Sequence, residues 1–191
     1  MDRKKAGPES ATPRPEAGPP AEALLKAALR LLSIRARSVK ELTDRLQRKG
    51  FTPSDVSYCV GWLKERDLLN DEAFARSLLR DRLRFSPRSP FLLERELKDK
   101  GVAASMAGEV LEAVLEEEGA SSERLSAEAA RSWVRKQSPA MRADLVGDRF
   151  SPERERARRR LHGFLARRGF VGDAARRGLE AGEKEARRQR D

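Results

Sequence analysis

Apolar residues recur at helical spacing along the chain from about residue 21 onward. In the stretch 21–34 they form one stripe, made of Leu24, Ala27, Ala28, Leu31 and Leu32. A second stripe contains Val39, Leu42 and Leu46. Ser38 precedes it with Glu41 three residues later, an arrangement typical of a capping box at a helix start. The pattern therefore predicts two successive amphipathic helices in this region.

The second predicted helix runs into the sequence RKGF at 48–51, and the chain repeats this ending as DKGV at 99–102 and RRGF at 167–170. If Gly50 takes a left-handed backbone just after the helix, Leu46 and Phe51 lie at the positions that touch in a Schellman stop. Two leucines precede each glycine at one spacing, and the three sets are Leu42, Leu46 and Gly50, then Leu93, Leu97 and Gly101, then Leu161, Leu165 and Gly169. The same helix stop is therefore predicted three times.

A second recurrence concerns the helix that opens a unit, because ARSLLR at 75–80 returns as ARSWVR at 130–135. The alternative, that the leucine–glycine spacing only reflects ordinary helix ends, does not account for this recurrence. We therefore predict an all-α protein of three tandem three-helix repeats that form an elongated, curved helical array. The predicted units are 21–69, 70–119 and 120–191, with an insertion near 138–152 in the third.

Both ends of the chain depart from this pattern. Residues 1–20 contain five of the ten prolines and almost no large apolar side chain, so a disordered Pro-rich tail is expected there. At the other end, Gly178 and Gly182 lie within the last apolar stripe. Because glycine weakens a helix interior, we expect the basic C-terminal end to fray.

The net charge is +10 and is unevenly distributed. Residues 151–191 contain 13 Lys and Arg against 7 Asp and Glu, whereas residues 21–120 are close to balance. A local positive field attracts polyanions such as nucleic acid or an acidic protein surface. The simpler reading is a well-solvated surface rich in arginine.

Residues able to carry out catalysis or bind a metal are scarce. His162 is the only histidine and Cys59 the only cysteine, and neither has a partner at ligand spacing. No phosphate-binding glycine loop is present. We therefore predict no catalytic residue, no metal site and no cofactor. Without an apolar run of 18 residues or a signal-peptide pattern, a cytoplasmic protein with no membrane contact is expected.

Several motifs of the chain resemble the RecX family of recombination regulators. The resemblance rests on ARSVKELTDRLQRKGF at 36–51, LNDEAFA at 69–75 and ELKDKG at 96–101, and it covers residues 22–118 well and the third unit weakly. The signature positions read mainly as core, caps and stops, and they are Ser38, Leu42, Leu46, Gly50, Phe51, Asn70, Asp71, Phe74, Leu93, Leu97, Lys100, Gly101, Leu161, Leu165 and Gly169. One departure is FSPRSP at 85–90, where family members usually have a glycine.

The resemblance implies a non-enzymatic regulator of homologous recombination and DNA repair. Family members lie along the groove of the RecA filament on single-stranded DNA, and usually lower its ATP hydrolysis, strand exchange and growth. The implied partners are the RecA filament and, secondarily, single-stranded DNA, with the chain itself a monomer.

The basic residues of the second and third units are the predicted contacts, and they are Arg76, Arg80, Arg82, Arg84, Arg88, Lys98, Arg131, Arg135, Arg156, Arg158, Arg159, Arg160, Arg167 and Arg168. For any one of them, a solvated helix face is the competing interpretation. The rival function is a helical-repeat protein that binds nucleic acid directly, without RecA. An enzyme is a third and weaker alternative.

Overall fold

The computed structural model of the protein describes residues 19–189. The predicted disordered tail lies almost wholly outside this range. Helices connected by short loops make up the described chain, which contains no strand. They are α1 (Glu22–Ile34), α2 (Val39–Gln47), α3 (Pro53–Lys64), α4 (Asp71–Phe85), α5 (Pro90–Asp99), α6 (Ala104–Glu117), α7 (Ser122–Arg135), α8 (Pro139–Leu145), α9 (Pro152–Arg167) and α10 (Gly172–Arg188). The all-α class is confirmed.

Most helices begin at a hydroxyl side chain that accepts a backbone hydrogen bond. Ser38 accepts from the amide of Glu41, as the capping box predicts, and Ser89 accepts from the amide of Leu92. Proline occupies the first helical position of α3, α5, α8 and α9, where its fixed backbone angle suits the helix and its missing N–H costs nothing. Local sequence therefore sets where these helices start.

The three predicted stops are confirmed. Gly50, Gly101 and Gly169 have φ values of 92°, 88° and 79°. In each case the amide after the glycine donates to the leucine carbonyl five residues before it, as from Phe51 to Leu46 at 3.4 Å. The sequence pattern missed two further stops of this kind at the ends of α3 and α6. They use Asp67 and Gly119, with φ values of 53° and 55°.

Buried side chains fall into two separate hydrophobic clusters. One belongs to α1–α3 and the segment just after them, and runs from Leu24 to Leu69. The other runs without a break from Phe74 in α4 to Ala186 in α10. The second and third predicted units therefore share one core, whereas the first has a core of its own.

The region predicted to carry an insertion contains the seven-residue helix α8, whose Leu145 is buried. The C-terminal end does not fray as expected, since α10 continues to Arg188. The two glycines that suggested fraying are buried where α10 meets its neighbours. A Cβ at Gly178 would overlap Ser126 and Leu165, and one at Gly182 would lie 2.6 Å from Leu161 Cδ2. Glycine thus permits close helix packing here.

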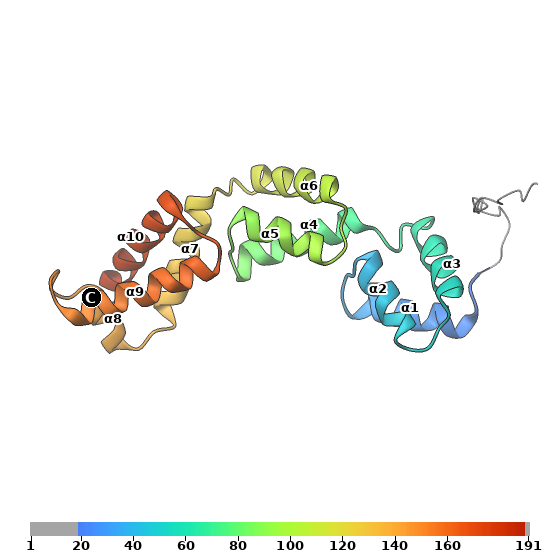
Figure 1. Cartoon of the computed structure of the whole chain (residues 1–191), viewed down its shortest axis with the longest axis horizontal. Helices are drawn as coiled ribbons and strands as arrows, with labels where there is room; N and C mark the ends of the chain where they lie inside the picture. Colours follow the sequence, from blue (N-terminus) through green and yellow to red (C-terminus); the bar gives the residue numbers. More distant parts are fainter. Residues whose placement is uncertain (1–18, 190–191) are drawn as a thin grey trace, which may run out of the picture.

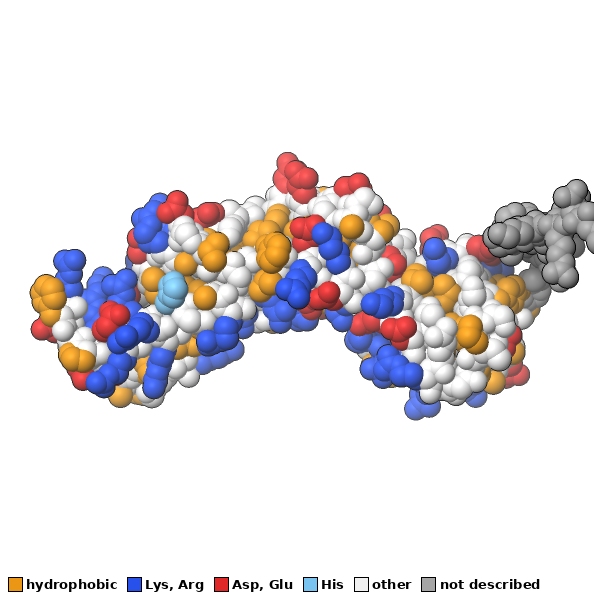
Figure 2. All heavy atoms as spheres, viewed as in Figure 1, with side chains coloured by type: hydrophobic (Ala, Val, Ile, Leu, Met, Phe, Trp, Pro, Cys, Tyr) orange, Lys and Arg blue, Asp and Glu red, His pale blue; other side chains and the backbone are white. Residues whose placement is uncertain are grey.

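The helices form an elongated array that bends along its length (Figure 1). Helices α1–α3 lie at one end, α4–α6 in the middle and α7–α10 at the other end. In the space-filling view the lower outline is indented where α1–α3 meet the middle group (Figure 2). This shape fits the predicted curved array, and a long surface rather than one enclosed pocket is available to a partner.

Candidate partner-binding surface

Two of the predicted contact arginines tie α4 to α6. Arg76 pairs with Glu117 at 2.8 Å and with Glu72 at 3.1 Å. Arg80 pairs with the same Glu117 at 3.0 Å. Arg135, which the ARS recurrence makes equivalent to Arg80, pairs in the same way with a glutamate of its own unit's last helix, Glu185, at 3.0 Å. These arginines link the first and last helices of their own units.

Two others, Arg82 and Arg88, converge on one carboxylate. Arg82 donates to both oxygens of Glu96, at 2.5 to 3.1 Å, and Arg88 lies 3.3 Å from it. Burial alone would raise the pKa of Glu96. The hydrogen bonds from Arg82 and the charges of Arg88 and Lys100 outweigh burial, so the pKa is lowered. Glu96 therefore stays ionised and holds two guanidinium groups in fixed positions.

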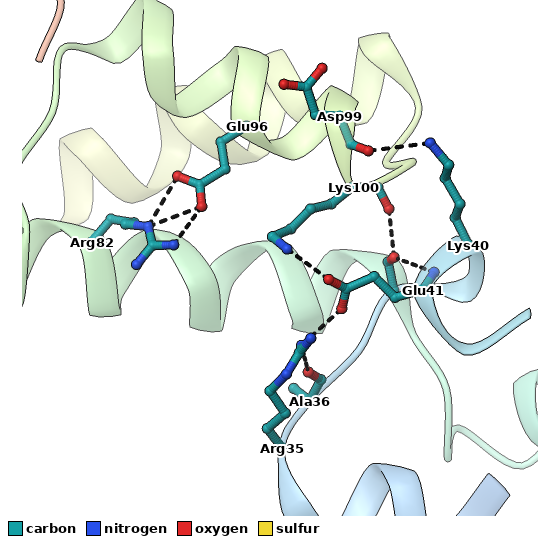
Figure 3. A network of polar contacts seen from close by, with 9 residues as sticks. Arg35, Ala36, Lys40, Glu41, Arg82, Glu96, Asp99 and Lys100 are labelled. Carbon is teal, nitrogen blue, oxygen red and sulfur yellow. Dashed lines mark hydrogen bonds and ion pairs between the residues drawn. The ribbon is translucent and has the colours of Figure 1, made fainter. Parts of the chain in front are cut away.

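The junction between the first and second units, which we call the first junction, is polar (Figure 3). The Ser38 hydroxyl donates to the Lys100 carbonyl at 2.5 Å, and Lys40 donates to the Asp99 carbonyl at 3.3 Å. Glu41 lies between Arg35, at 2.8 Å, and Lys100, at 2.6 Å.

Glu41 itself is strongly affected by this position. Its burial favours the neutral acid, but the hydrogen bonds and charges of Arg35 and Lys100 dominate and lower its pKa from about 4.5 to about 2. The signature residue Asp71 adds one more contact across the junction, because its carboxylate accepts from the Val39 amide at 2.8 Å. Asn70 is the cap of α4.

The junction between the second and third units, which we call the second junction, is built in the same way, from the start of one helix and the end of another. The amide of Ser89, the cap of α5, donates to the carbonyl of Arg168 at 2.9 Å. The Arg168 guanidinium donates to the Pro87 carbonyl at 2.8 Å and lies over the Phe164 ring. Arg168 therefore connects the second and third units, and its predicted contact with a partner stays a prediction.

The same contact occurs at both junctions. The glycine that ends the second helix of one unit packs against the start of the second helix of the unit before it. A Cβ at Gly101 would overlap Lys40, and one at Gly169 would overlap Ser89, whereas nothing in the described chain lies within 4 Å of a Cβ at Gly50. Sequence reasoning found the glycines as helix stops and missed this second role. The signal was present, since Ser38 and Ser89 begin the helices that Gly50 and Gly101 end.

In the third unit half of the predicted contacts, counting Arg135, have acidic neighbours. Arg158 lies 3.3 Å from Glu183, and Arg156 and Arg159 lie 3.9 and 3.6 Å from glutamates of their own helix. In the second unit Lys98 pairs with Glu94 at 2.6 Å, and Arg84 lies over the exposed Phe85 ring. Within residues 19–189 no ion pair involves Arg131, Arg160 or Arg167.

Charge is nevertheless separated on the molecular surface. Figure 2 shows acidic side chains gathered over α6 and Lys and Arg side chains spaced along the lower edge of the array. Helix α6 itself contains glutamates and no basic residue. The surface of α6 is thus unsuited to a polyanion, whereas the lower edge offers spaced cations with acidic side chains among them (Figure 2).

A curved array of helical units with polar junctions and one basic edge defines the chain as a helical-repeat binding protein. Residues 25–63 match the family model described as RecX, first three-helix domain, and residues 70–111 match RecX, second three-helix domain. The chain belongs to the RecX family.

Individual relatives agree with this assignment. The chain is 32% identical over 173 residues to "Regulatory protein RecX" of Halorhodospira halophila, covering 91% of this chain and 96% of that protein. It is 37% identical over 158 residues to the Corynebacterium efficiens protein of the same name, covering 80% and 70%. The fold is similar to the crystal structure of RecX from Lactobacillus salivarius, with a TM-score of 0.61 at 22% identity, over 85% of this chain and 96% of that one. A regulatory role follows from the family.

Within the described part of the chain, no helix is long and apolar enough to cross a membrane.

Proposed function

We propose that this protein regulates homologous recombination by binding along the groove of the RecA filament on single-stranded DNA, and that it inhibits ATP hydrolysis, strand exchange and filament growth without being an enzyme. The observation that carries the proposal is a curved array of repeated units with Lys and Arg along one edge, in a chain of the RecX family. A repeating ligand is well matched by a repeating protein, because successive units can contact successive subunits.

The two cores support the same proposal. The second and third units share a core and form a continuous body, while the first is attached through a polar junction. Such an arrangement lets the first unit adjust to the pitch of a helical filament while the rest docks as one piece. We further propose that the protein acts in the cytoplasm, where the filament assembles, and that it does so as a monomer.

Co-sedimentation tests the binding step. RecA filaments assembled on single-stranded DNA with a non-hydrolysable ATP analogue should carry the protein into the pellet, and should do so at concentrations where DNA alone does not. Equal retention by bare DNA and by filaments would contradict binding to RecA.

A direct nucleic-acid-binding protein is the second candidate function. The observation in its favour is a groove along α5 whose lining includes Arg88, Arg95 and Lys100 together with Glu96 and Asp99, on the helix that also carries the exposed Phe91. Tight binding to DNA with no effect on RecA would favour this candidate.

A further inference from the structure

A groove runs along α5 between the two junctions. It is lined by Arg88, Leu92, Arg95, Glu96, Asp99 and Lys100, and we call it the α5 groove. Lys100 belongs to the first junction, and Arg88 lies close to Arg168 of the second. A ten-residue helix is about 15 Å long, so the groove offers several cations in a row, as a chain of phosphates requires.

The cations at the α5 groove outnumber the carboxylates that they contact. Glu41 contacts both Arg35 and Lys100, Glu96 contacts both Arg82 and Arg88, and Asp99 contacts Arg95 alone. Three carboxylates therefore face five cations. Because the side chains are already ordered, an anion that binds there loses less entropy than one that must order free arginines.

Repulsion beside the groove, at the second junction, points the same way. Burial and the nearby charge of Arg88 lower the pKa of Arg168 at the second junction. Two guanidinium groups that repel each other at a partly buried place are stabilised when an anion comes between or beside them.

The helix that forms the α5 groove also has an exposed aromatic residue, Phe91, which is not among the residues that line the groove. Phe91 precedes Arg95 by one helical turn, so both lie on the same stripe of α5. Phe91 is 69% exposed. Single-strand binding proteins combine a basic groove, which follows the phosphates, with aromatic rings on which bases stack. This combination favours a nucleic-acid strand over an acidic protein surface.

We infer that the α5 groove binds single-stranded nucleic acid directly, with phosphates on Arg88, Arg95 and Lys100 and a base stacked on Phe91, while Glu41 and Glu96 position the cations. The inference rests on the proposed function and deepens it, because the strand of the filament then contacts the regulator itself. Arg95 was absent from the contacts predicted from sequence, and the third unit's arginines are secondary in this arrangement.

Arg95 and Lys98 provide a matched pair for the test. Both are on α5 and have side chains 68% and 44% exposed, but only Arg95 lines the groove. Binding of a fluorescein-labelled oligothymidylate of about twenty nucleotides is measured by anisotropy without RecA, for the full chain and for R95A, K98A and F91A. Circular dichroism verifies that each variant remains folded.

R95A should weaken oligothymidylate binding about three- to tenfold more than K98A, and should reduce the slope of log affinity against log salt by about 0.7, the value for one lost contact to a single strand. F91A should weaken binding of the oligonucleotide about fivefold or more. It should leave binding of inorganic polyphosphate, which has no bases, unchanged, whereas R95A weakens both.

Equal effects of R95A and K98A would overturn the inference. The inference would also be overturned if R95A weakened binding of a polyglutamate peptide and left oligonucleotide binding unchanged. That result would mean that the groove binds an acidic protein. Neither result bears on whether the wild-type protein inhibits RecA, which is measured separately, so failure of this inference is distinguishable from failure of the proposed function.

Discussion

At the scale of single residues, the glycine that ends a unit's second helix has two separate roles. Its backbone is left-handed, and in the second and third units its missing side chain leaves space for the preceding unit. Gly50 has only the first role, because nothing lies within 4 Å of its Cβ position. The three glycines thus share one backbone conformation and differ in their surroundings.

Replacing each glycine by alanine separates these roles. G50A should lower the free energy of unfolding by about 1–2 kcal/mol, the cost of a left-handed backbone for an L-residue. G101A and G169A should cost more, since the added methyl also overlaps Lys40 and Ser89. Urea unfolding followed by circular dichroism measures all three, and equal losses would show that contact at the junctions contributes nothing.

At the scale of helices, close approach determines where α10 lies. Gly178 and Gly182 face α7 and α9, and a methyl group at Gly178 would overlap Ser126 and Leu165. Helix propensity alone would favour alanine at both positions by up to about 1 kcal/mol. Packing therefore opposes local preference here.

The pair G178A and G108A tests which of the two effects dominates. Gly108 lies within α6 with nothing within 4 Å of its Cβ position, so G108A should stabilise the protein by about 0.5–1 kcal/mol. G178A should destabilise it despite the same gain in propensity. A stabilising G178A, measured by thermal unfolding, would show that α10 does not pack closely on α7 and α9.

The contribution of the first junction to stability should depend on pH, through the ionisation of Glu41. A carboxyl whose pKa is lowered on folding stabilises the folded state above its unfolded pKa, and this contribution is lost as the pH falls toward the folded pKa. For Glu41 the loss should occur between pH 4.5 and 2. Wild type should therefore be more stable than E41Q at neutral pH, with the difference vanishing toward pH 2.

Tryptophan fluorescence can follow this change. The chain has two tryptophans, Trp62 in α3 and Trp133 in α7, so a W133F background reports on the first unit alone. Urea titrations of W133F with and without E41Q, repeated from pH 7 to pH 2, measure the difference. A difference that is constant across this range would contradict an ionised Glu41 between Arg35 and Lys100.

At the scale of the whole molecule, sequence predicted the fold class and the helix stops because both depend on local signals. Periodicity, hydroxyl caps and left-handed glycines act within one or two turns. The roles of the arginines depend on distant partners. Arg76 pairs with Glu117, which is 41 residues further along the chain, and Lys100 pairs with Glu41, which is 59 residues before it. Nothing in local sequence marks these pairs, so sequence alone did not show that several of the arginines predicted to contact a partner also pair within the chain.

The central claim, that this protein regulates the RecA filament, is tested most directly by ATP hydrolysis. Cognate RecA is assembled on single-stranded DNA and its ATP turnover is measured while the protein is added from well below to equal molar amounts. The account predicts inhibition at substoichiometric amounts, because one elongated array contacts several filament subunits. Unchanged turnover at equimolar protein, under conditions where the protein binds the same DNA tightly, would contradict it.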